Sequence, residues 1–146
     1  MRRRYVLDTN IVSETQKPAP NPLVASWMEA QVDDDLYIST IVLGEIKQGI
    51  LQLAEGRRKQ ALLDWFDGPT GPMRLFAGRV LAFDIPAALI WAELIAEGRR
   101  AGRPRSAIDM QIAAIACANG CAVVTCNAQH FEPVRERVEI VDPTST

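Results

Sequence analysis

The sequence lacks most features that would place a protein in a class at once. Its 146 residues include 3 cysteines, 1 histidine and 6% aromatic residues, and no apolar run approaches the ~20 residues that span a bilayer. An odd number of nearby cysteines is a poor disulfide framework, so we expect reduced thiols. Asp8 and Asn10 interrupt the apolar stretch that a signal peptide would need. We therefore expect a cytoplasmic protein with no membrane contact.

Lysine is scarce, and Lys59 is the last one in the chain. Phosphate-receiving signalling domains, and phosphatases with an aspartate nucleophile, need a late lysine to bind phosphoryl oxygens, so this class is disfavoured. The net charge of −2 argues against nucleic-acid binding by bulk charge. Positive charge lies instead in arginine clusters, which suit phosphate binding but can also be solvated helix ends.

Short apolar segments alternate with helical patterns along the whole chain. Strands are predicted at residues 4–7, 36–39, 79–83, 122–124 and 138–141, and helices at residues 11–16, 23–31, 40–53, 57–66, 84–100 and 106–119. The strands are continuously apolar, which is typical of strands covered by helices on both faces. A chain of this length fits one domain. We predict a single domain over residues 1–146, a three-layer α/β/α sandwich with a mainly parallel central sheet.

Several polar side chains come directly after predicted strands or near the start of the helices that follow. Asp8 follows the first strand, and Glu45 lies in the second turn of the helix after the second strand. Asp109 lies in the first turn of a late helix, and Asn127 and His130 follow the strand at 122–124. Ligands of open parallel sheets bind beyond the carboxyl ends of the strands. We expect these side chains to meet at one edge.

Each of the three carboxylates also has a purely structural interpretation. Asp8 can be a turn residue, and Glu45 can be an exposed glutamate in a helical salt bridge. Asp109 can complete a capping box that begins at Ser106. The functional hypothesis therefore depends on their joint placement.

Three clustered carboxylates repel one another, and a divalent cation removes the conflict. Hard oxygen ligands favour Mg²⁺, with Mn²⁺ possible, over zinc. Such a centre can activate water and clamp a phosphate, so phosphodiester hydrolysis is the chemistry that it suits.

Four segments carry a family resemblance that covers nearly the whole chain. Residues 5–14, 38–46, 109–116 and 124–131, in this order and spacing, resemble the PIN-domain nucleases, most closely the VapC and FitB toxins of bacterial toxin–antitoxin pairs. The resemblance implies a hydrolase, a magnesium-dependent endoribonuclease that is toxic until a small antitoxin inserts a segment into its groove. It also implies a homodimer.

The resemblance assigns catalytic, metal-binding roles to Asp8, Glu45 and Asp109. It implies that Thr9 or Asn10, together with Asn127, positions these carboxylates through hydrogen bonds.

Two positions depart from the family pattern. His130 stands where many members have a fourth aspartate, although some FitB-like toxins also have histidine there. A neutral imidazole supplies no negative charge, so we expect a weaker hold on a second metal ion. Cys126 stands where arginine is common, which removes one phosphate contact.

The late arginine cluster gains a possible role from this resemblance. Arg99, Arg100, Arg103 and Arg105 precede Asp109 in the sequence, and we expect them to hold the RNA backbone beside the metal groove.

Two other kinds of function remain open. A zinc site from Cys117, Cys121, Cys126 and His130 has suitable spacing, but the strand at 122–124 would carry Cys126 away from the others. The chain can also be a catalytically weak binding protein that works through its antitoxin partner, although the intact set of carboxylates argues against this.

The three tryptophans, Trp27, Trp65 and Trp91, recur with apolar neighbours at helical spacing. We interpret them as core or dimer-interface residues and not as base-stacking platforms, because helices would cover both sheet faces.

Overall fold

The computed structural model describes residues 2–145. Its elements, in chain order, are β1 (Tyr5–Leu7), α1 (Thr9–Glu14), α2 (Pro22–Glu29), the 3-10 helix η1 (Asp33–Asp35), β2 (Leu36–Ser39), α3 (Thr40–Leu51), α4 (Arg57–Asp67), α5 (Pro72–Leu75), β3 (Val80–Leu81), α6 (Ile85–Arg100), α7 (Ala107–Ala118), β4 (Ala122–Val124), the 3-10 helix η2 (Ala128–Val134) and β5 (Ile140–Val141).

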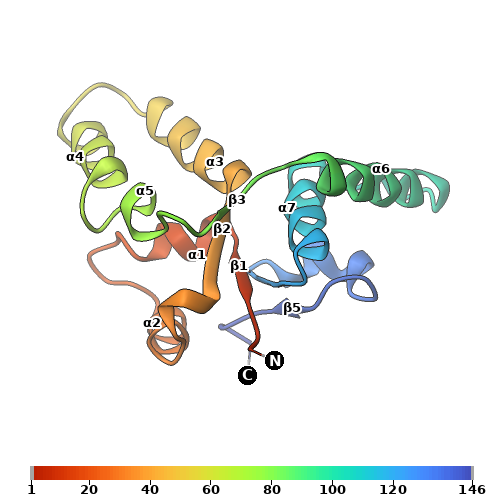
Figure 1. Cartoon of the computed structure of the whole chain (residues 1–146). Helices are drawn as coiled ribbons and strands as arrows, with labels where there is room; N and C mark the ends of the chain where they lie inside the picture. The colour runs from red at the N-terminus through yellow and green to blue at the C-terminus, as the bar shows by residue number, and fades with distance from the viewer. Residues whose placement is uncertain (1, 146) are drawn as a thin grey trace.

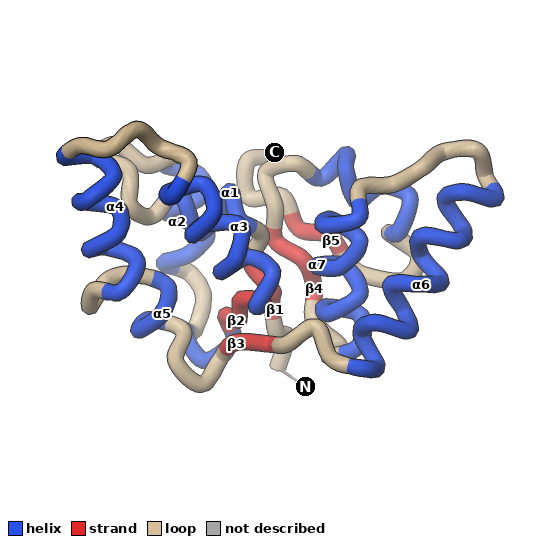
Figure 2. Tube along the Cα trace, turned by 90° about the horizontal axis from the view of Figure 1, so that it is seen from above, coloured by secondary structure: helices blue, strands red, loops and turns tan. Residues whose placement is uncertain are grey.

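The strands form one five-stranded sheet in the order β3-β2-β1-β4-β5, and every pairing is parallel. Helices α1 to α5 lie on one side of the strands, and α6 and α7 lie on the other (Figures 1 and 2). The expected α/β fold is confirmed, with a sheet that is parallel throughout. None of the helices within residues 2–145 has the length and apolar character needed to cross a bilayer.

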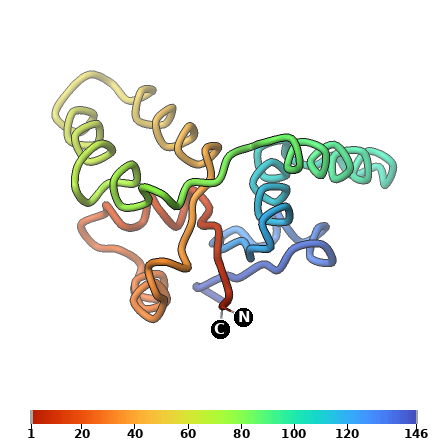
Figure 3. The backbone as a smooth tube through the Cα atoms, in the orientation of Figure 1, coloured from red at the N-terminus to blue at the C-terminus, as the bar shows by residue number. Residues whose placement is uncertain are grey.

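The direction of the chain reverses at the centre of the sheet. From β1 the chain moves outward through β2 to β3, and it then returns to the other side of β1 as β4. In Figure 3 the red start of the chain lies beside the blue C-terminal part. Leu7 is in register with Val124, so Asp8 and Thr125 leave the sheet side by side. This switch point is where open parallel sheets bind their ligands.

The core explains why these strands are short and apolar. Both central strands, β1 and β4, are buried along their whole length, and α7 covers them with a buried run from Ile112 to Ala116. Helix α6 packs along α7. Ser39 fixes the start of α3 because its Oγ accepts a hydrogen bond from the Val42 backbone N–H at 3.1 Å. The cap thereby sets the position of Glu45, two turns into the helix.

The structure differs from the predicted elements at a few boundaries. Helix α1 begins at Thr9 and not at residue 11, because the Asp8 carboxylate accepts the Thr9 N–H and caps the helix directly. The short helix α5, with Pro72 in its first turn, was not predicted from the glycine- and proline-rich segment before it. The outer strands β3 and β5 are each two residues long, shorter than expected.

Candidate active site

Asp8 is the most firmly held carboxylate of the molecule. It is 6% exposed, and it accepts hydrogen bonds from the Thr9 N–H and the Thr125 Oγ1, both at 2.8 Å, and from the Asn10 Nδ2 at 3.3 Å. These three donors come from the start of α1 and from the end of β4. The side chain of Asp8 is therefore fixed by two segments that are distant in the sequence.

Thr125 is a site residue that sequence reasoning missed. Its side chain is fully buried at 0% exposure, donates to Asp8, and accepts the Asn127 N–H at 3.0 Å. Asn10 strengthens the same link, because its Oδ1 accepts the Cys126 N–H at 3.0 Å. The sequence did contain a signal for Thr125, because it is a hydroxyl residue that directly follows the fully apolar strand at 122–124.

Glu45 is joined to the Asp8 corner through Thr9. The Thr9 Oγ1 donates to the Glu45 Oε1 at 2.7 Å, across the gap between α1 and α3. The alternative interpretation, a helical salt bridge, is wrong for residues 2–145, since Glu45 forms no ion pair with any of them. Its half-buried carboxylate is left facing the space between the helices.

Asp109 uses only half of the capping box that the sequence suggested. Ser106 caps α7 because its Oγ accepts the Asp109 N–H at 3.2 Å. The Asp109 carboxylate makes no return bond to Ser106 within residues 2–145; its Oδ2 lies 3.6 Å from the His130 Nδ1. The cap fixes the backbone of Asp109 and leaves the carboxylate turned toward Asp8.

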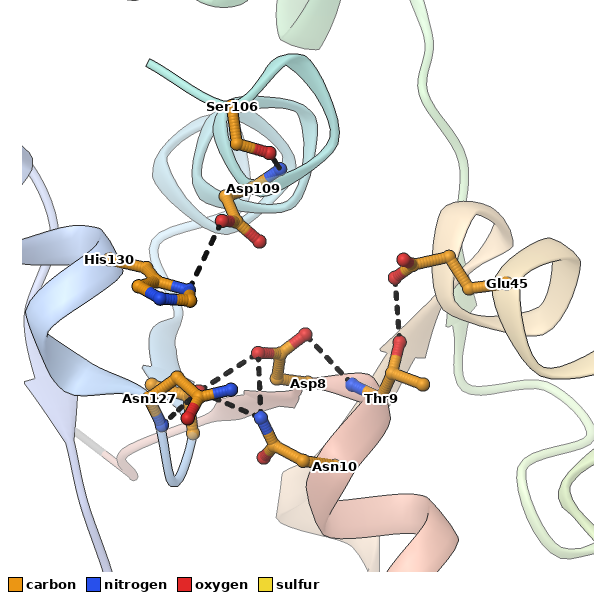
Figure 4. Close-up of polar contacts among 9 residues, drawn as sticks. Asp8, Thr9, Asn10, Glu45, Ser106, Asp109, Asn127 and His130 are labelled. Atoms are coloured by element: carbon orange, nitrogen blue, oxygen red, sulfur yellow. Dashed lines mark hydrogen bonds and ion pairs between the residues drawn. The ribbon is translucent and has the colours of Figure 1, made fainter. Parts of the chain in front are cut away.

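The three carboxylates converge on one opening, which Figure 4 shows with Asp8, Glu45 and Asp109 pointing toward one another. Burial raises the pKa of Asp8, and the negative charge of Asp109 raises it further against the lowering effect of its hydrogen bonds. Burial also raises the pKa of Glu45, and both Asp8 and Asp109 add to that rise. The opening is thus short of positive charge.

The carboxylate oxygens of Asp8, Glu45 and Asp109 are ligands that suit a hard divalent cation, although they are not arranged as a complete metal site. Within the described part of the chain, no three acidic, histidine or cysteine side chains are gathered tightly enough to hold a metal as they stand. That finding also gives no support to a zinc site that includes Cys117, Cys121 and Cys126. Among residues 2–145, His130 is the one basic group paired with any of the three carboxylates. Oxygen donors with an uncompensated charge fit Mg²⁺ or Mn²⁺.

The supporting residues named from the sequence lie around this opening. Thr9 and Asn10 bond directly to the carboxylates, and Asn127 lies at the edge of the cluster, tied to Thr125 through its backbone (Figure 4). His130 faces Asp109 and is half exposed.

The four arginines differ in where they lie. Arg99 and Arg100 are exposed at the end of α6. Arg103 lines a hollow of about 280 Å³ that Asp109 and His130 also line. Arg105 borders that hollow too, but its side chain is 13% exposed, donates to the Leu94 carbonyl at 2.8 Å and lies 3.5 Å from Glu97. The guanidinium of Arg105 is therefore engaged in holding α6, which the sequence did not indicate.

Comparison with known proteins places this geometry in a family. The model of the PIN domain matches residues 5–136. The plasmid stability protein StbB of Pseudomonas syringae is 42% identical over 127 residues, 87% of this chain and 90% of that protein. The VapC ribonuclease Y4jK of Sinorhizobium fredii is 35% identical over 138 residues, covering 94% and 96%. Toxin FitB of Neisseria gonorrhoeae is 35% identical over 126 residues, covering 86% and 89%.

A solved structure agrees with these relatives. The crystal structure of FitAcB from Neisseria gonorrhoeae superposes with a TM-score of 0.87 at 32% identity, covering 97% of this chain and 99% of that one. The match extends over the whole sheet and both helical layers, including the segments that carry the converging carboxylates. The chain belongs to the PIN domain family, and within it to the type represented by the VapC and FitB toxins.

Proposed function

We propose that this protein is a metal-dependent endoribonuclease and the toxin of a type II toxin–antitoxin pair. The observation that carries the proposal is the convergence of Asp8, Glu45 and Asp109 at the switch point of the sheet (Figure 4). Relatives named as a VapC ribonuclease and as toxin FitB support the choice of RNA as substrate and of toxicity as the outcome. The whole chain would act as one nuclease domain.

In this proposal Asp8, Glu45 and Asp109 hold Mg²⁺, or Mn²⁺ in its place. When bound, such an ion supplies positive charge to the phosphate and makes water more acidic. Asp8 provides a fixed oxygen pair because three hydrogen bonds hold it. Thr9 orients Glu45. A half-buried carboxylate with a raised pKa, such as Glu45, is also suited to accept a proton from water near the phosphate.

The remaining side chains would position the site and its substrate. Asn10 and Asn127 keep the Asp8 corner in place through Thr125. His130 orients the Asp109 carboxylate. Among the arginines, Arg99, Arg100 and Arg103 are the exposed candidates for the RNA backbone.

The proposed partners follow from the relatives. FitAcB is one of several similar solved structures, another is described as a toxin–antitoxin complex, and FitB is named as a toxin, so we propose that a small cognate antitoxin protein blocks this site. A homodimer in the cytoplasm, where the substrate RNA lies, completes the proposal.

RNA cleavage by the purified protein tests the proposal. The parent should cut single-stranded RNA with Mg²⁺ or Mn²⁺ and stop cutting with a chelator. Asp8→Asn should lower the rate by about a hundredfold or more. Asp34→Asn, an exposed change on η1, is the matched control and should keep the parental rate. Absence of metal-dependent cleavage in the parent would contradict the proposal and favour a binding protein that acts only through its antitoxin.

A further inference from the structure

A hollow of about 230 Å³ opens directly beside Glu45, and we call it the Glu45 hollow. Thr9 and Glu45 line the end nearest the carboxylates, while α1, α3 and α4 supply the rest of the lining. A second hollow of about 380 Å³ shares Gln16, Arg58 and Leu62 with it and extends it outward. On the other side of the carboxylates lies the hollow lined by Arg103, Asp109 and His130. The carboxylate opening therefore lies between two hollows.

The lining of the Glu45 hollow combines apolar walls with polar side chains, two of which have no partner within the described chain. Ile46, Leu62 and Trp65 supply aliphatic and aromatic surface. Gln16 and Arg58 also line it, and neither side chain forms a hydrogen bond or ion pair with any of residues 2–145. Trp65, which we expected from the sequence to be a core or dimer-interface residue, is half-buried and also faces this hollow. Glu45 is the one acidic residue in the lining within the described chain.

This combination matches a nucleobase joined to a phosphate at the carboxylates. A base has flat apolar faces that pack on aliphatic and aromatic side chains, and a polar edge that is read by hydrogen bonds. The Arg58 guanidinium offers donors only, and the Gln16 amide offers a donor and an acceptor. Such a rim favours a base with acceptor atoms on its edge, such as guanine.

The backbone of α3 leaves room for this occupant at Gly49. A Cβ on Gly49 would meet no atom within 4 Å, although the residue lines the hollow. Any larger side chain at this position therefore extends into open space and not into the core. Glycine in the middle of a helix is destabilising relative to other residues, so its presence here keeps the hollow open at a cost to the helix.

We propose that the Glu45 hollow binds one RNA base next to the phosphate that is cut, and that Arg58 and Gln16 select it. The inference rests on the ribonuclease activity proposed above and adds to it a base preference at one position beside the cut.

Two measurements test the inference on the full-length protein. The first sequences the cut ends of a randomised single-stranded RNA pool, for the parent and for Gly49→Leu, Arg58→Ala and Gln16→Ala. Gln48→Leu on α3 and Arg57→Ala on α4 are the matched controls, because both residues are exposed and neither lines the hollow. The second follows the Gly49 amide and the Trp65 indole N–H by NMR during titration with each of the four nucleoside 5′-monophosphates.

We expect Gly49→Leu to raise the Tm while lowering kcat/KM by about tenfold, mainly through KM, because the base can no longer enter. Arg58→Ala and Gln16→Ala should flatten the preference at a single position beside the cut, and the two control variants should keep it. Guanosine monophosphate should shift both NMR signals in the parent. In Gly49→Leu, the shift of the Trp65 indole should be lost.

The opposite outcomes separate this inference from the proposed function. If the parent cuts RNA and Gly49→Leu keeps its base preference and kcat/KM, the inference is wrong and the nuclease stands. If Gly49→Leu cuts as the parent does but escapes inhibition by its antitoxin, the hollow belongs to a protein partner and the inference is again wrong. If the parent cuts no RNA, the nuclease proposal fails and the base preference beside a cut fails with it, even if nucleotides still shift Trp65.

Discussion

Two corners of the carboxylate opening are built in different ways. Asp8 is almost fully buried and accepts three hydrogen bonds, from Thr9, Asn10 and Thr125. Asp109 is held at its backbone by a helix cap, while the one ion-pair partner of its carboxylate among residues 2–145 is the half-exposed His130, at 3.6 Å. Glu45 is intermediate, with one hydrogen bond from Thr9. Three hydrogen bonds hold the first corner, so we call it the rigid corner; one contact at 3.6 Å leaves the second less constrained, and we call it the mobile corner because we expect it to move more easily.

This difference indicates how the opening can bind a cation without being a ready-made cage. In the proposed metal site, Asp8 would supply oxygens held in a fixed position, whereas Glu45 and Asp109 would have to move to reach the ion. The cost of ordering those two side chains would lower the affinity for the ion. Variants at Glu45, Thr125, His130 and the arginines should therefore differ in how strongly they reduce RNA cleavage, metal binding and stability.

The largest effect is expected at Glu45. Glu45→Gln keeps the oxygen that accepts from Thr9 and removes the charge, so RNA cleavage should fall by about a hundredfold or more. The raised pKa of Glu45 means that the folded protein binds this proton more tightly than the unfolded chain does. Its contribution to stability is therefore complete at low pH and is lost as the pH rises from 4.5 through the raised folded pKa.

Thermal unfolding without metal tests this account of Glu45. The Tm of Glu45→Gln should exceed that of the parent at pH 7, and the difference should shrink as the pH falls toward 4. A Tm at pH 7 below that of the parent would show that the carboxylate stabilises the metal-free protein and would contradict the account.

A smaller loss is expected from the rigid corner. Thr125→Val removes the hydroxyl that bonds Asp8 and leaves the partly buried Asn127 N–H without its acceptor. Cleavage should fall by about tenfold or more, and the free energy of unfolding by about 1–3 kcal/mol. The bond from Thr125 lowers the pKa of Asp8, so its loss should move the acidic limb of the pH–rate profile to higher pH.

Thr125→Ser is the matched control, since it keeps the hydroxyl. It should restore the pH profile and most of the cleavage rate. A Thr125→Val protein that is less stable but has an unshifted pH profile would mean that the residue only supports the fold.

The mobile corner should respond to charge. His130→Asp adds a carboxylate beside Asp109, so the Mg²⁺ concentration for half-maximal cleavage should fall by about fivefold, and a second bound ion should be detectable by calorimetry. His130→Asn changes the side chain without adding charge and is the control. An unchanged metal stoichiometry in His130→Asp would contradict the expected weak hold on a second ion.

The smallest effects are expected from the arginines. Arg103→Ala should weaken RNA binding by about threefold and reduce the salt slope by about 1, with no change in Tm. Arg105→Ala should instead lower the Tm, because its guanidinium bonds to Leu94 and lies beside Glu97. Equal effects of the two variants on the salt slope would place Arg105 on the RNA as well.

The fold was largely predictable because its signals are local. The continuously apolar strands and the Ser106 cap each act within a few residues, and the structure has both. The short helix α5 was not predicted, and the outer strands β3 and β5 were predicted at the right places but too long, because their bounds depend on packing between distant segments.

The site was predictable in part. Asp8, Glu45 and Asp109 could be named because each has a fixed place relative to a strand or a helix start. Their alternative interpretations could be judged only in three dimensions, where Glu45 has no salt bridge and Asp109 makes only half of its capping box. Thr125 was missed because its partner, Asp8, lies 117 residues away.

The link between Asp8 and Thr125 also concerns the order in which the chain is made. Asp8 is synthesised well before its partner, because Thr125 lies 117 residues later in the chain. A growing chain that has not reached β4 therefore carries the Asp8 carboxylate without the threonine that fixes it. We expect the carboxylate cluster to assemble only after β4 has left the ribosome.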